Sequence, residues 1–259
     1  MVLPEHIVQA ARDGDIAVVE AFLDAAPGAI NDSDEESELT LLMLCMNSSI
    51  KERHIWFARR LIVRGADVNV GDFEDNFPLH YASFPGDCAS SMVSLLLESG
   101  ARVDARTNTE DEMTPLGQLI EDFDYCLWQN NVAENRRRIS RSGLEIMKLL
   151  LKAGASIDRC KEGRSAEACM QAFLSDRPHY ANDEFFARCQ EIVAGVRAHG
   201  SFKAYVREPH RQFLRLRSLL VRGRAKVRGS TKDSRRLERL ARLPNGACWH
   251  VLSFWREAG

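Results

Sequence analysis

The sequence has 259 residues, of which 45% are hydrophobic and 28% charged, a composition typical of a folded globular protein and unlike that of a disordered one. It contains no run of about 18 apolar residues, so we expect neither a membrane-spanning helix nor a membrane partner. The seven cysteines are scattered and never spaced as C-x-x-C, which favours reduced thiols and a cytoplasmic or nuclear location.

A leucine-rich helix that ends in Gly-Ala recurs along the chain. It occurs in residues 58–69, 93–104 and 147–158, with fainter copies in residues 18–31 and 191–202. A short helix start precedes these copies, at residues 10–15 and then at Thr40, Phe77, Thr114 and Ser165. Thr114 can cap such a helix and Pro115 suits its first turn, whereas Gly65, Gly100 and Gly154 suit a left-handed position after the last turn. One helix pair cannot bury its apolar face alone, so we expect the pairs to stack.

This pairing resembles the ankyrin repeat, in which Thr-Pro-Leu-His-x-Ala precedes a helix that ends in Gly-Ala, with a period of about 33 residues. The residues that match are Pro78, Leu79, His80 and Ala82, and then Thr114, Pro115 and Leu116. The resemblance implies an all-α, ankyrin-like solenoid of about five irregular helix-pair repeats with a C-terminal helical cap or small domain. It also implies that His80 braces its loop through hydrogen bonds to the backbone. Another kind of helix-pair repeat is the alternative.

An insertion of about residues 121–143 lies between the two helices of the fourth repeat. It carries an arginine cluster and the aromatic residues Phe123, Tyr125 and Trp128. We expect either an extended first helix whose aromatic side chains face the core, followed by a solvated loop, or a recognition loop. The string Arg137-Arg138-Ile139-Ser140 also predicts a phosphorylation site at Ser140.

The loops between repeats depart from the family pattern. Asp75 and Glu112 stand where glycine is usual and Phe77 where threonine is usual, so we expect connections that are not ideal hairpin turns. By resemblance, partners contact the loop tips and the inner helices behind them. The expected protein-binding residues are Phe73, Asp75, Phe77, Tyr81, Asp111, Glu112 and Met113. Their mixture of acidic and apolar side chains favours a partner protein with a basic segment.

Charge divides the chain near residue 200. Residues 1–200 hold 20 basic and 33 acidic side chains, whereas residues 201–259 hold 15 and 4. We therefore expect an ankyrin-repeat domain over residues 1–202 and a basic, helical C-terminal element over residues 203–259, whose first helix opens at Pro209. The simplest role for this element is to cap the last repeat.

Two other roles for the C-terminal element are open. Ser218-Leu219, and Leu243-Pro244 followed by an apolar helix with Trp249 and Phe254, resemble the SOCS box. That resemblance implies docking on elongin C and a cullin, so that the chain would be a substrate-receptor adaptor of a ubiquitin ligase. The arginines of the element also suit nucleic-acid phosphates, but no DNA- or RNA-reading motif accompanies them and we rank this partner last.

Motifs for chemistry are absent from the sequence. It has no Walker A, dinucleotide-binding, H-E-x-x-H or G-x-S-x-G pattern. We therefore expect no catalytic residue, cofactor or metal. The predicted function is a non-catalytic protein–protein interaction module that binds a partner through its concave face and loop tips. A ligase adaptor and a nucleic-acid-associated scaffold are the alternatives.

Overall fold

The computed structural model describes residues 2–46, 50–123, 133–180 and 183–222. The chain divides into two compact units, Met1–Val193 and Ala194–Gly259, so that the division falls within a helix. The domain boundary expected after residue 202 stays a prediction.

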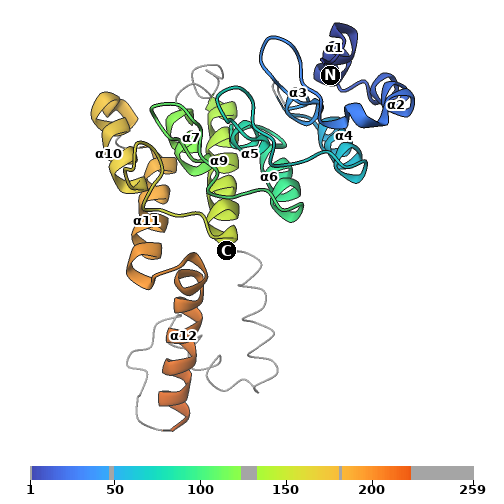
Figure 1. The fold of residues 1–259 in the computed structure, drawn as a ribbon. Coiled ribbons are helices and arrows are strands. Elements are labelled where there is room, and N and C mark those ends of the chain that lie inside the picture. Colours follow the sequence, from blue (N-terminus) through green and yellow to red (C-terminus); the bar gives the residue numbers. More distant parts are fainter. Residues whose placement is uncertain (1, 47–49, 124–132, 181–182, 223–259) are drawn as a thin grey trace. The chain divides into compact units, whose positions relative to one another are not determined.

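Helix pairs follow one another along the first unit, and the last helix continues into the second unit (Figure 1). In the described residues the pairs are α1 (Glu5–Asp13) with α2 (Ile16–Ala25), α3 (Leu41–Leu44) with α4 (Glu52–Val63), α5 (Pro78–Ala82) with α6 (Ala89–Glu98), α7 (Pro115–Glu121) with α9 (Ala133–Ala153), and α10 (Ala166–Asp176) with α11 (Glu184–His199). Short 3₁₀ helices, η1 (Pro27–Asn31) and η2 (Pro178–Tyr180), follow α2 and α10. The short inner helices α3, α5 and α7 contact one another in succession, and so do the outer helices α4, α6 and α9. The all-α stack of helix pairs that the sequence predicts is confirmed.

The ends of these helices carry the residues that the sequence predicts there. The side-chain oxygen of Thr114 accepts a hydrogen bond from the backbone N–H of Gly117 at 3.2 Å, and Pro115 is the first residue of α7. Left-handed φ angles of 99°, 90° and 104° occur at Gly65, Gly100 and Gly154. These local signals set where each helix begins and ends.

Between repeats, short polar side chains tie one Gly-Ala end to the next. Asn31 accepts a hydrogen bond from the backbone N–H of Asp67 at 2.8 Å, and Asn69 accepts one from Arg102 at 2.8 Å. Asp104 does the same for the N–H of Ser156 at 2.9 Å. Because each bond joins one repeat to its successor, this series fixes the spacing along the stack.

The turns at Asp75 and Glu112 close as hairpin turns, so the expectation that they depart from this geometry is wrong. Asp75 has a φ of 55° and Glu112 a φ of 41°, the left-handed conformation that glycine usually supplies. In the third repeat the N–H of Asp72 donates to the carbonyl of Asn76 at 3.2 Å, and the N–H of Asp75 donates to the carbonyl of Asp72 at 2.9 Å. The turn geometry is therefore kept, at a cost of about 1 kcal/mol for each acidic residue in this conformation.

The insertion lengthens the second helix of the fourth repeat. One interpretation of the sequence predicted a longer first helix, and this prediction is wrong. Helix α7 ends at Glu121, whereas residues 133–143 form the first half of α9. The extension packs against the loop before α6, because Arg138 pairs with Asp87 at 2.8 Å and the hydroxyl of Ser142 donates to the carbonyl of Gly86 at 2.6 Å. Residues 124–132, where a recognition loop was expected, lie outside the described residues.

An aromatic cluster covers the end of α7. Phe123 is fully buried and stacks on Phe185 of α11 with 3.7 Å between the ring centroids. Phe173 of α10 stacks on Phe186 at 4.6 Å. The prediction that aromatic residues of the insertion face the core is confirmed for Phe123, whereas Tyr125 and Trp128 are not described.

The second unit is described as far as helix α12 (Phe202–Val221). This helix begins at Phe202 and contains Pro209, so the expectation that Pro209 opens it is wrong. Ser201 provides the start instead, since its hydroxyl oxygen accepts the N–H of Ala204 at 3.2 Å and its carbonyl accepts the N–H of Tyr205 at 3.0 Å. The two further helices expected in residues 223–259 lie outside the described residues.

Candidate functional site

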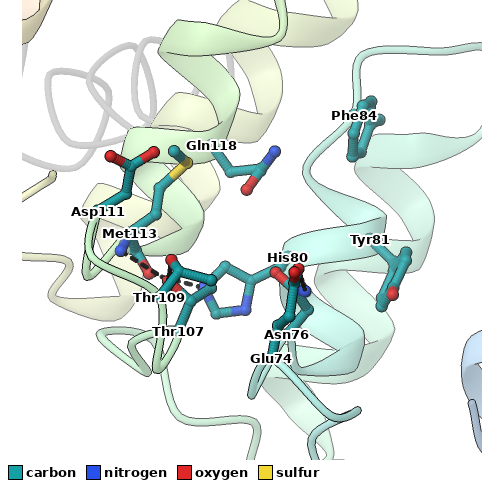
Figure 2. Close-up of a pocket in the computed structure, with 10 residues that line it drawn as sticks. All are labelled: Glu74, Asn76, His80, Tyr81, Phe84, Thr107, Thr109, Asp111, Met113 and Gln118. Atoms are coloured by element: carbon teal, nitrogen blue, oxygen red, sulfur yellow. Dashed lines mark hydrogen bonds between the residues drawn. The ribbon is translucent and has the colours of Figure 1, made fainter. Parts of the chain in front are cut away.

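A groove of about 350 Å³ lies between the inner helices α5 and α7 and the two loops that precede them. Its lining residues are Glu74, Asn76, His80, Tyr81, Phe84, Thr107, Thr109, Asp111, Met113 and Gln118. Figure 2 shows Tyr81 and Phe84 on one side, and Asp111, Met113 and Gln118 on the other. Each side of the groove thus comes from a different repeat.

His80 joins the two sides of the groove. Its Nδ1 accepts the backbone N–H of Phe77 at 3.0 Å, so Nε2 of the neutral ring donates to the carbonyl of Met113 at 3.1 Å (Figure 2). His80 is almost completely buried, and this burial lowers its pKa. The ring is therefore neutral at pH 7 and makes the backbone contacts that the resemblance implies.

Asp72 organises the loop on the α5 side, and sequence reasoning missed it. This buried carboxylate accepts the backbone N–H groups of Glu74 at 2.9 Å and Asn76 at 2.8 Å. It also accepts the hydroxyl of Tyr81 at 2.6 Å, and burial together with this carboxylate raises the pKa of Tyr81. Aspartate before a turn is a known signal for such bonds, and the Asp-x-Glu-x-Asn string carries it.

Thr107 and Asn108 hold the loop on the α7 side against its neighbour. The hydroxyl oxygen of Thr107 accepts the N–H of Met113 at 2.9 Å. The backbone N–H of Asn108 donates to the carbonyl of Glu74 at 2.9 Å, and its side-chain amide donates to the carbonyl of Phe73 at 3.2 Å. The two walls are therefore fixed relative to each other, which favours binding with little reorganisation.

The groove has an excess of negative charge. Among the residues that the structure describes, Glu74 and Asp111 are its two acidic lining residues, and its lining has no lysine or arginine. Lys161 lies nearby with its Nζ 3.5 Å from Asp111 Oδ2, but it is shared with Glu121 at 3.6 Å. Because His80 is neutral, no lining residue of the groove repels a cation.

The structure places the predicted protein-binding residues in two groups. Tyr81, Asp111 and Met113 line the groove. The others lie on the adjoining loop tips. Phe73 is 57% exposed, whereas Asp75 and Phe77 are half-buried, and the Arg102 guanidinium lies 5.0 Å from the ring centroid of Phe77. Glu112 is exposed and forms an ion pair with Arg106 at 3.1 Å.

His80 was predicted to have a structural role. Six other residues that line the groove were not among the predicted binding residues: Glu74, Asn76, Phe84, Thr107, Thr109 and Gln118. The polar strings Asp72-x-Glu-x-Asn and Thr107-x-Thr mark the turns that position most of them. The groove itself has no local signal, because it forms only where two repeats meet.

The predicted docking and modification residues have separate positions. On α12, Ser218 is half-buried and Leu219 is 42% exposed, whereas Leu243, Pro244, Trp249 and Phe254 lie outside the described residues. Ser140 is half-buried within α9. Adaptor docking and phosphorylation therefore both stay predictions.

Helix α12 also presents a row of basic side chains. Among its described side chains, the exposed cationic residues are Lys203, Arg207, Arg211 and Arg215, which recur at every fourth position. Residues four apart lie on the same side of a helix, so the row gives α12 one basic face. This face suits an anionic partner, and a nucleic-acid partner stays a prediction.

Groups for catalysis or metal binding do not gather elsewhere in the described part of the chain. No three His, Cys, Asp or Glu side chains there are placed to hold a metal ion. Burial raises the pKa of both Cys45 and Cys160 to about 12, so these thiols are protonated at pH 7. The absence of catalysis, cofactor and metal stays a prediction. Among the helices of the described residues, none has the length and apolar character of a membrane span.

Comparison with known proteins gives one family. The family model of ankyrin repeats, in three copies, matches residues 7–116, which run from α1 into the start of α7. No curated protein matches the chain. Ankyrin repeats generally mediate protein–protein interactions and are typically non-catalytic. The match shows ankyrin repeats in residues 7–116, and the stacked helix pairs are consistent with an all-α, ankyrin-like solenoid.

Proposed function

We propose that the chain is a non-catalytic module that binds a basic segment of a partner protein along the groove between α5 and α7 and the loop tips beside it. The groove carries this proposal, since its two walls come from successive repeats and are held together by hydrogen bonds before any partner arrives. A site of this kind loses little conformational entropy on binding.

Size and charge support a basic, extended segment. A volume of about 350 Å³ accommodates one or two side chains and not a whole helix. Glu74 and Asp111 provide negative charge at this position, and Phe73 adds an exposed apolar surface on the neighbouring tip. Electrostatic complementarity of this kind raises the association rate and selects against acidic partners.

Selection from a random peptide library on the full chain, followed by fluorescence anisotropy, tests the proposal. We expect the selected peptides to be basic. The variant Phe73→Ser/Glu74→Gln should weaken their binding by about tenfold, a change typical of one lost contact of moderate strength. Both side chains lie at the surface, so the variant should remain folded.

The variant Val63→Ser/Glu98→Gln is a matched control on the outer helices. It also removes one exposed apolar side chain and one carboxylate, since Val63 is 80% exposed on α4 and Glu98 is exposed at the end of α6. It should leave the affinity unchanged. Equal effects of the two variants, or selected peptides without basic residues, would contradict the proposal.

A ligase adaptor is the second candidate function, favoured by the exposure of Leu219 on α12. A large apolar side chain that is 42% exposed beside Ser218 is available for docking. Purified elongin B–elongin C mixed with the full chain should co-elute in gel filtration if this function is correct, and Leu219→Asp should abolish the complex. Separate elution of the wild-type chain rejects the adaptor function.

A further inference from the structure

We propose that the groove between α5 and α7 is a recognition site for an arginine side chain. This inference rests on the proposed function and names the residue of the partner segment that the groove reads. Three properties of the lining carry it: its charge, its mixture of aromatic and polar groups, and its rigidity.

The charge of the groove selects a cation. Glu74 and Asp111 belong to different walls, so a cation between the walls is attracted from both. Neither carboxylate is neutralised by a dedicated partner in the described residues: Glu74 accepts a weak bond from the Asn76 amide at 3.3 Å, and Asp111 shares Lys161 with Glu121. The neutral ring of His80 adds no opposing charge.

The other lining groups favour arginine over lysine. Tyr81 and Phe84 give the α5 wall an aromatic character, and guanidinium groups stack on aromatic rings more readily than ammonium groups. Oxygen acceptors come from several directions, from the hydroxyl of Thr109, the side-chain amide of Asn76 and that of Gln118. Five N–H donors in a planar fork can use such a set, whereas the compact ammonium group of lysine satisfies fewer of them.

The groove is also prepared for its occupant. The Tyr81 hydroxyl is fixed on Asp72, the Gln118 amide donates to Asp122, and the Met113 backbone is held by both His80 and Thr107. An arginine side chain therefore enters a lining whose main positions are already set. This arrangement reduces the entropy cost of binding a long, flexible side chain.

Nuclear magnetic resonance of the full chain with ¹³C-labelled methionine methyl groups tests the site, because Met113 lines the groove. The Met113 signal is assigned by its loss in Met113→Leu. The probes are N-acetyl-arginine amide, N-acetyl-lysine amide and N-acetyl-citrulline amide, which has the shape of the arginine probe without its charge. We expect the arginine probe to shift the Met113 signal saturably, with an affinity at least about threefold higher than that of the lysine probe, and the citrulline probe to produce no shift.

Variants separate the groove from general acidity of the surface. Glu74→Gln and Asp111→Asn should each weaken the arginine probe by at least about threefold, whereas Glu110→Gln, an exposed acidic residue outside the groove lining, should leave it unchanged. Phe84→Leu should remove the preference for arginine over lysine. Equal binding of arginine and citrulline, equal binding of arginine and lysine, or no effect of Glu74→Gln and Asp111→Asn overturns the inference.

The two proposals fail in distinguishable ways. If selected peptides need the groove face but tolerate citrulline in place of every arginine, the inference fails and the proposed function stands. If the arginine probe binds the groove while no selected peptide depends on that face, the arginine site stands and the proposed function fails.

Discussion

The third and fourth repeats connect to the next loop through different atoms. In the third repeat, the imidazole of His80 donates to the carbonyl of Met113 at 3.1 Å. At the same motif position the fourth repeat has Gly117, and there the N–H and hydroxyl of Thr114 reach the carbonyl of Cys160 at 2.9 and 3.2 Å. In each case the carbonyl belongs to a residue that closes the next loop by a backbone hydrogen bond. Met113 closes one loop with Thr107, and Cys160 closes the other with Arg164.

The difference teaches that this fold needs the contact and not a particular residue. In the third repeat, the side chain of His80 spans a wider gap between α5 and the next loop, and this gap leaves room for the groove. In the fourth repeat the next loop lies directly on the helix, since a Cβ atom on Gly117 would be 2.2 Å from the Cys160 oxygen. The histidine and the glycine are therefore two solutions with different surface consequences.

Gly117→Ala should have the largest effect on stability. The added methyl group would meet the backbone of Cys160, with 2.2 Å to its oxygen and 2.9 Å to its carbon, and a backbone cannot rotate away. We expect a loss of about 3 kcal/mol in the free energy of unfolding, measured by urea denaturation. Gly28→Ala is the control, because a Cβ atom there has no neighbour within 4 Å. Wild-type stability of Gly117→Ala would show that the loop at Cys160 is not in close contact with α7.

His80→Ala should cost about 2 kcal/mol in the same measurement. It leaves the N–H of the half-buried Phe77 without its acceptor, and it removes one of the two donors to the Met113 carbonyl, which keeps the N–H of Thr107. His6→Ala, on the exposed side of α1, should change the stability by less than about 0.5 kcal/mol. Equal stability of the two variants would mean that the imidazole does not hold the loops together.

Glu112→Gly should stabilise the chain by about 0.5–1 kcal/mol, since glycine adopts a φ of 41° without strain. Glu112→Ala is the matched variant, because it also removes the surface pair with Arg106 but keeps the strained backbone. The glycine variant should therefore unfold at a higher urea concentration than the alanine variant. Asp75→Gly should gain less, because aspartate tolerates this conformation better than glutamate. If Glu112→Gly were no more stable than Glu112→Ala, the backbone at Glu112 would not be strained.

The pH dependence of stability should show the smallest effect. Burial lowers the pKa of His80 below the usual 6.5, so the unfolded chain binds more protons than the folded chain as the pH falls below 6.5. The contribution of His80 is thus complete above pH 6.5 and is lost as the pH decreases from there toward its folded pKa. Urea denaturation between pH 5 and pH 8 should give a steeper acid loss for the wild-type chain than for His80→Gln. Parallel curves would contradict a neutral, buried imidazole.

The sequence by itself determined the repeat architecture of this protein. Helix starts at Thr40 and Thr114 and left-handed ends at Gly65, Gly100 and Gly154 depend on interactions within a few residues, and such signals are readable without a fold. The resemblance to ankyrin repeats led to the prediction of Tyr81, Asp111 and Met113 as protein-binding residues, and these three line the groove. Their role in binding stays a prediction.

Only the tertiary structure decided where the groove lies and which residues line it. Glu74 meets Asn108, and Gly117 meets Cys160, across sequence distances that vary with the length of each loop and with the insertion before α9. The left-handed turns at Asp75 and Glu112 were not predicted, although hydrogen bonds accepted by the nearby Asp72 and Thr107 outweigh the preference of an acidic residue for other conformations. Local propensity thus fixes the helix ends, whereas the shape of the groove follows from distances between repeats.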